Sequence, residues 1–215
     1  LPGVIQMEDY DVGGQGISYF DNDPENQGNV YREDGVDIVG LGCSDTLNTE
    51  NCAGYAIGYT NAGEWLEYSF NAVTGAKFIF VAHVASGLEG AGFMLFVDGK
   101  AVTDTIVIPA GEDWDTYTDV KGETAMIEKG QHILRVKFTG AYGNMDWIQF
   151  ALTEEEIIGL HKGKNLVRMN FNENGANVQY YDMQGHRLNK AATKRPGIYL
   201  VKTPQGSFMK RVEKR

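Results

Sequence analysis

Hydrophobic and polar residues alternate along most of the first 150 positions, which is the period of a β-strand with one buried face. The alternation predicts nine strands, at 3–8, 36–39, 64–71, 76–85, 92–97, 101–108, 116–120, 131–138 and 145–151. The glycine-rich segment SGLEGAG and the DGK at 98–100 supply turns between neighbouring strands. Short strands at regular spacing indicate an all-β fold, an antiparallel β-sandwich.

The alternation stops at residues 152–165, whose sequence LTEEEIIGLHKGKN is charged. We expect a linker here, with one short helical turn at Glu154–Leu160. Residues 1–151 then form one domain, and residues 166–215 a second, small β-rich domain with strands at 166–171, 178–182, 197–202 and 207–212. Fifty residues or so bury little apolar surface, so the second unit is marginal on its own.

Charge divides the chain at the same place. Residues 1–160 hold 7 basic and 26 acidic side chains, a net charge of −19, whereas residues 161–215 hold 12 basic and 3 acidic ones, a net charge of +9. This asymmetry indicates two units with separate roles. The acidic unit is unsuited to nucleic acid and anionic surfaces, which leaves neutral sugars or metal ions as its partners. No run of 18 apolar residues predicts a membrane span.

Two cysteines, Cys43 and Cys52, lie in one polar loop. They predict a disulfide that closes a short loop in an oxidising, extracytoplasmic compartment, and two free thiols are the alternative. The chain opens at LPGVIQMEDYD without a signal peptide, so we expect it to be cut from a longer precursor.

Six segments, taken in order, carry a recognisable pattern. They are IQMEDYD, NVYREDGVDI, IGYTNAGEWLEYSF, FMLFVDGK, GEDWDTYTDV and GQHILRVKFTGAYGNMDWIQF. Over residues 4–151 the chain resembles a family 6 carbohydrate-binding module. The resemblance implies a lectin-like β-sandwich (jelly roll) without catalytic activity, a sugar site in the loops at one end, and a structural calcium ion.

Tyr31 and Trp114 match the aromatic pair that sandwiches a sugar ring in the family. Both lie in polar loop contexts, where a large aromatic residue is less expected to be core than in an alternating strand. Asn144 matches the family's asparagine before DWI, whose amide can bridge two sugar hydroxyls, with a turn role as the alternative. Glu25 is expected to add a hydrogen bond to the same ligand.

Trp65 and Trp147 lie in alternating strands, and we interpret both as core residues. Some family members have a second binding surface on the concave sheet face, which Glu67 or Tyr68 would line here. His83 lies among hydrophobic strand neighbours, and we interpret it as a satisfied sheet residue.

The calcium site implied by the resemblance uses Gln6, Glu8 and Asp146. Two residues apart on a strand, Gln6 and Glu8 would share one face. Backbone carbonyls from the loop at 21–30 would complete an oxygen cage that suits Ca²⁺ better than zinc. A solvated acidic patch is the alternative.

The C-terminal segments YDMQGHRL, GIYLVKT and KRVEKR resemble the sorting-type tails of secreted bacterial glycan-degrading enzymes. The tail would direct export or cell-surface attachment, or bind anionic polymers and acidic domains through its charge. We therefore expect a secreted or cell-surface bacterial protein.

The resulting hypothesis is a monomeric, non-enzymatic module that binds xylan or xylo-oligosaccharides and targets an upstream catalytic domain of the same precursor, such as a xylanase or acetylxylan esterase. Cellulose, β-1,3-glucan and agarose are alternative ligands. A glycoside-processing enzyme finds little support, because no carboxylate pair stands out, GxSxG and HExxH are absent, and the four histidines show no ligand spacing. A protein-binding adhesive domain is the third alternative.

Overall fold

The computed structural model describes residues 1–43, 52–154 and 156, together with the backbone of four strands between residues 179 and 212. The chain divides into two compact units, Leu1–His161 and Lys162–Arg215. The division falls within the segment predicted as a linker.

One sheet of the first unit is built around its last strand. The strand order is β10-β6-β12-β4-β3, and every pairing is antiparallel. The strand β1 also pairs with β12, on the same side of β12 as β4 and opposite β6. The strands are β1 (Gly3–Gln6), β3 (Ile38–Leu41), β4 (Gly54–Ile57), β6 (Ile79–Ala85), β10 (Thr118–Glu123) and β12 (Asn144–Ala151).

The other sheet has the order β2-β5-β11-β7-β8, with β9 also paired to β7, and is likewise antiparallel. Its strands are β2 (Tyr19–Phe20), β5 (Trp65–Ala72), β7 (Gly92–Val97), β8 (Lys100–Ala101), β9 (Ile106–Val107) and β11 (Gly130–Phe138).

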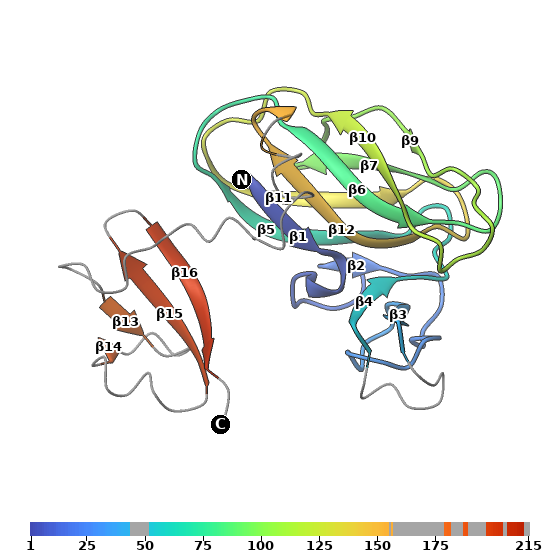
Figure 1. Cartoon of the computed structure of the whole chain (residues 1–215), viewed down its shortest axis with the longest axis horizontal. Coiled ribbons are helices and arrows are strands. Elements are labelled where there is room, and N and C mark those ends of the chain that lie inside the picture. Colours follow the sequence, from blue (N-terminus) through green and yellow to red (C-terminus); the bar gives the residue numbers. More distant parts are fainter. Residues whose placement is uncertain are drawn as a thin grey trace. The chain divides into compact units, whose positions relative to one another are not determined.

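The two sheets of this unit face each other (Figure 1). They enclose one hydrophobic core. Alternate residues of each central strand point into it: Leu134, Val136 and Phe138 of β11 are fully buried, as are Phe80 of β6 and Phe150 of β12. Burying these side chains is the main favourable term in folding, at about 25 cal/mol per Å² of apolar surface. The predicted antiparallel β-sandwich is confirmed for this unit.

The two tryptophans interpreted as core residues are not part of it. Trp65 lies half-buried beneath the guanidinium of Arg135, whose Cζ is 3.8 Å from the ring centre. Trp147 is half-buried and stacks on His83 with centroids 5.1 Å apart. The strand pleat turns Leu66 inward instead of Trp65, and a β-bulge between Met145 and Trp147 resets the alternation of β12.

His83 itself has a hydrogen-bond partner, as expected, because its Nδ1 lies 2.8 Å from a carboxylate oxygen of Asp119.

The segment predicted as one strand at 101–108 is interrupted, with only its ends paired, as β8 and β9. The first predicted strand also stops early: β1 ends at Gln6, and a short 3-10 helix, η1, follows at Met7–Asp9.

The disulfide predicted between Cys43 and Cys52 is present. It packs against Gly40 of β3, where a Cβ would lie 2.3 Å from the Cys43 Sγ and 2.5 Å from the Cys52 Sγ. A residue with any side chain at position 40 would therefore displace the bridge.

The second unit contains an antiparallel sheet in the order β14-β13-β15-β16. Its strands are β13 (Gln179–Tyr181), β14 (Arg187–Leu188), β15 (Gly197–Thr203) and β16 (Gly206–Val212). The predicted strand at 166–171 and most of the predicted turn at 154–160 lie outside the described residues, and an independent small domain stays a prediction. Within the described part of the chain, no helix has the length and hydropathy needed to cross a membrane.

Candidate functional site

Trp114 lies in the loop between β9 and β10, in a turn organised by the residue before it. The Asp113 carboxylate accepts hydrogen bonds from the backbone N–H groups of Asp115, at 2.9 Å, and Thr116, at 2.7 Å. These bonds lower the pKa of Asp113, as expected for a carboxylate that closes an Asx turn. The turn presents Trp114 with 41 % of its surface exposed.

The Trp114 indole is fixed on two sides. Its Nε1 donates a hydrogen bond to the carbonyl oxygen of Tyr142 over 3.1 Å. A Cβ at Gly87 would lie 3.0 Å from three carbons of the six-membered ring. Only glycine lets the ring pack this closely on the backbone, so the indole is anchored against Gly87 while much of its surface stays open to solvent.

Asn144, at the start of β12, is only 5 % exposed. Its Nδ2 donates a hydrogen bond of 2.9 Å to the backbone carbonyl of Trp114. On the other side, its Oδ1 lies close to Gly58, where a Cβ would approach it to 3.2 Å. The structure thus brings together Trp114 and Asn144, two of the predicted sugar-binding residues, through a direct contact.

Tyr31 lies in a second loop, between β2 and β3, and is 51 % exposed. Its ring is tilted against Tyr55 of β4 with centroids 4.7 Å apart, and its hydroxyl donates to the Asp9 carboxylate at 2.5 Å. Partial burial and the bond to Asp9 raise the pKa of Tyr31 to about 12. Its backbone is left-handed, with φ of 67°, which is uncommon for a bulky residue.

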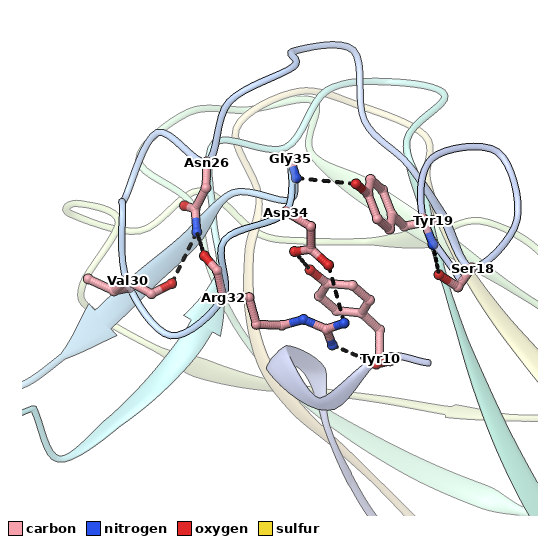
Figure 2. A network of polar contacts seen from close by, with 9 residues as sticks. Tyr10, Ser18, Tyr19, Asn26, Val30, Arg32, Asp34 and Gly35 are labelled. Atoms are coloured by element: carbon pink, nitrogen blue, oxygen red, sulfur yellow. Dashed lines mark hydrogen bonds and ion pairs between the residues drawn. The ribbon is translucent and has the colours of Figure 1, made fainter. Parts of the chain in front are cut away.

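A polar network holds this loop (Figure 2). The Arg32 guanidinium lies over the Tyr10 ring at 3.7 Å, donates to the Tyr10 carbonyl at 2.7 Å, and pairs with Asp34 at 3.2 Å. The Tyr10 hydroxyl also donates to Asp34. Asn26 spans the loop by donating to the carbonyls of Val30 and Arg32. These contacts fix the conformation of the loop and therefore the position of the Tyr31 backbone.

The same loop borders a pocket of about 880 Å³ lined by residues between 24 and 34, including Glu25 and Tyr31. Trp114 and Asn144 do not line it. Glu25 and Tyr31 thus share this pocket, whereas Trp114 and Asn144 share a direct hydrogen bond.

Two further aromatic residues belong to the Trp114 group. Tyr59 and Tyr142 are 51 % and 49 % exposed. Both lie in glycine-containing polar segments, GYTNAG and AYGN, the same kind of context that singled out Tyr31 and Trp114. The sequence therefore contains this signal for Tyr59 and Tyr142, although the strand pattern does not single them out.

Comparison with known families gives a match over residues 32–151 to the model described as carbohydrate binding module (family 6). The chain belongs to this family. The module is accordingly a non-catalytic carbohydrate-binding domain, and the match ends where β12 ends. No curated protein matches the chain.

Solved structures share the fold. They include the module CBM6cm-2 of Cellvibrio mixtus lichenase 5A in complex with cellotriose, at 22 % identity and TM-score 0.53, over 71 % of this chain and 98 % of that one. CsCBM6-3 from Clostridium stercorarium in complex with cellobiose matches at 24 % identity and TM-score 0.51, over 70 % and 93 %. The C-terminal module of LamC, a marine laminarinase from Zobellia galactanivorans, matches at 19 % and TM-score 0.50, over 69 % and 97 %.

One of the residues predicted to hold calcium in the module, Glu8, has an unsatisfied buried carboxylate oxygen. Glu8 is 9 % exposed, and its Oε2 is buried without a hydrogen-bond partner. Burial, with the nearby carboxylates of Asp9 and Asp146, raises the pKa of Glu8 to about 7. The strand geometry predicted for the pair is wrong, because Glu8 belongs to η1, whereas Gln6 ends β1 opposite Trp147.

This donor set fits a hard cation. A positive ion would satisfy the orphaned Glu8 oxygen and offset the repulsion between Glu8 and Asp146. No three His, Cys, Asp or Glu side chains are grouped around a common metal position in the described part of the chain. A calcium ion would therefore need neutral oxygens too, from the Gln6 amide and from backbone carbonyls.

Proposed function

We propose that the module binds a neutral β-linked plant cell-wall polysaccharide, xylan in the first place, and thereby brings an attached catalytic domain to its substrate. The observation that supports this most directly is the Trp114 indole, which is anchored on Gly87, joined to Asn144 and still 41 % exposed. An exposed, rigidly held aromatic ring is what a sugar-binding site requires.

The reason lies in the shape of a pyranose. Its C–H faces are apolar and its rim is a ring of hydroxyls, so an aromatic face covers the former while polar groups bind the latter. Trp114 and Tyr31 would provide the faces. Asn144 and Glu25 would provide hydrogen bonds to the rim.

Charge favours a neutral polymer. Residues 1–160 have a net charge of −19, which would repel pectin-like or nucleic-acid polyanions. Xylan and β-glucans carry little or no charge. Two structural relatives were solved with cellotriose and cellobiose, and these complexes make cello-oligosaccharides the second candidate ligand.

Isothermal titration calorimetry of the whole chain with xylohexaose and with cellohexaose tests the proposal. We expect binding of at least one, stronger for xylohexaose. We expect a loss of about tenfold or more in Trp114→Ala, since truncating an aromatic anchor of a binding site costs about 2 kcal/mol or more. Phe20→Ala is the matched control, because Phe20 of β2 is a ring of similar exposure, 39 %. Equal affinities in the Trp114→Ala variant and the wild type would refute the assignment of this site.

Calcium is proposed as a structural ion at Glu8, Asp146 and Gln6. When bound, it would supply a fixed positive charge and nothing catalytic. Glu8 and Asp146 would act as its anionic ligands, joining η1 to β12 and so pinning the first and last strands of the sandwich together.

We also propose the kind of precursor protein to which the module belongs and the compartment in which it works. We expect an upstream catalytic domain in the same precursor, such as a xylanase or acetylxylan esterase, and a secreted or cell-surface bacterial protein. The disulfide between Cys43 and Cys52 suits an oxidising compartment. The basic C-terminal unit would serve export or surface attachment.

A further inference from the structure

Two tyrosines near Trp114 have a backbone conformation that bulky residues rarely adopt. Tyr59 has φ of 50° and Tyr142 has φ of 63°, both in the left-handed region. Each side chain is about half exposed. Residues held in this region cluster at ligand sites, because only the surrounding structure can maintain them.

Thr60 links the two tyrosine-bearing loops. The backbone N–H of Tyr142 donates to the Thr60 carbonyl at 2.6 Å. The buried Thr60 hydroxyl donates to the Gly143 carbonyl at 2.6 Å and accepts from the Gly143 N–H at 3.0 Å. Three hydrogen bonds therefore join Thr60 to Tyr142 and Gly143, more than 80 positions away in the chain, and they fix the backbone next to both tyrosines.

A second set of bonds ties Tyr142 to the proposed sugar platform. The Tyr142 carbonyl accepts from the Trp114 indole N–H at 3.1 Å and from the Ser86 hydroxyl at 2.9 Å. Asn144, two residues on, holds the Trp114 carbonyl. Tyr59, Tyr142 and Trp114 are thus three exposed rings on one hydrogen-bonded framework.

We propose that Tyr59 and Tyr142 form additional sugar subsites beside Trp114, so that the site takes an extended oligosaccharide and not a single sugar. This inference rests on the proposed function, which it deepens. Each ring would cover the apolar face of a further sugar residue, and the rigid framework avoids the entropy loss of ordering the rings on binding.

The neighbourhood of the rings suits a carbohydrate. Asn61 lies two residues after Tyr59, is partly exposed, and donates to the Tyr59 carbonyl at 3.2 Å. The aromatic rings would cover the apolar faces of the sugar residues, and the amide and carbonyl groups between the rings would bind their hydroxyls. A protein partner would instead favour a continuous apolar patch.

Binding of xylo-oligosaccharides from xylobiose to xylohexaose tests the inference by calorimetry, with the cello-oligosaccharide series in parallel. The variants are Tyr59→Asn and Tyr142→Asn, because asparagine tolerates a left-handed backbone, with Tyr59→Phe and Tyr142→Phe as ring-retaining controls. We expect each Asn variant to weaken hexasaccharide binding about threefold to tenfold while changing disaccharide binding less than about twofold. The Phe variants should keep the wild-type dependence on length.

Two results would overturn the subsites. One is an unchanged dependence on length in both Asn variants. The other is an equal loss at every length together with a lowered melting temperature, which would mark the tyrosines as purely structural. If these results appear while Trp114→Ala still weakens binding about tenfold or more, the proposed function stands without the extra subsites. If the wild-type chain binds neither series, both proposals fail.

Discussion

The side-chain amide of Asn144 donates a hydrogen bond of 2.9 Å to the backbone carbonyl of Trp114, joining the last strand of the sandwich to the loop between β9 and β10. Asn144 is buried and Trp114 is partly exposed, so this bond is partly shielded from water. The residue expected to bind sugar hydroxyls therefore also positions the aromatic platform. Substitution of Asn144 tests this double role.

Replacing Asn144 by Asp removes the N–H donor and places a carboxylate oxygen near the Trp114 carbonyl. We expect glycan affinity to fall about tenfold, because an unsatisfied buried carbonyl costs about 1–3 kcal/mol. We also expect a lower melting temperature. Calorimetry with xylohexaose and thermal unfolding measure the two effects, and an Asn144→Asp variant that equals the wild type in both would show that the bond has no such role.

Gly87→Ala tests the anchoring of the indole. The new Cβ would lie 3.0 Å from three ring carbons, so the indole has to shift by a few tenths of an ångström. We expect glycan affinity to fall by about threefold to tenfold with a smaller change in unfolding temperature. Gly54→Ala is the control, since its Cβ would meet only Leu41 at an ordinary 3.7 Å. Equal affinities for the two variants would contradict the anchoring.

Removing calcium should destabilise the module. Without the ion, the negative charges of Glu8 and Asp146 repel each other. One buried Glu8 oxygen also has no hydrogen-bond partner. We expect EDTA to lower the melting temperature by several degrees, an effect that added Ca²⁺ reverses. In Glu8→Gln the response to EDTA should shrink. A melting temperature that EDTA leaves unchanged in the wild type would exclude a structural ion at this position.

Asp37 predicts a pH dependence of stability. It is 2 % exposed, and its carboxylate accepts from the Gln27 N–H at 2.6 Å. Burial, reinforced by the nearby carboxylates of Glu64 and Asp23, raises the pKa of Asp37 to about 6. A raised pKa means that the folded state binds the proton more tightly, so the stability contributed by this group is present at low pH and is lost as pH rises from about 4 to about 6.

Asp37→Asn keeps the acceptor for Gln27 and removes the titration. We expect the melting temperature of the variant, relative to the wild type, to rise steadily between pH 4.5 and pH 7 and then to level off. Thermal unfolding across this range, at constant ionic strength, gives the comparison. A temperature difference that does not vary with pH would mean that Asp37 titrates normally in the folded protein.

Most of the sandwich follows from the sequence. The strand at 92–97 has the predicted bounds, β11 and β12 begin one residue earlier than predicted, and β5 is shifted by one residue at each end. Period-2 alternation identifies a strand with one buried face wherever the strand is long. It fails for β2, which is two residues long, and for β4, where GYAI shows no clear alternation.

The sequence by itself determined the all-β class, the disulfide, the family motifs and the exposure of Tyr31 and Trp114. Only the tertiary structure decided that Trp65 and Trp147 face outward, because alternation does not say which face meets the other sheet and the bulge in β12 shifts the alternation. It also decided the conformations of Tyr59 and Tyr142. A left-handed backbone is maintained by hydrogen bonds from distant segments, as between Thr60 and Gly143, and local sequence contains no record of such bonds.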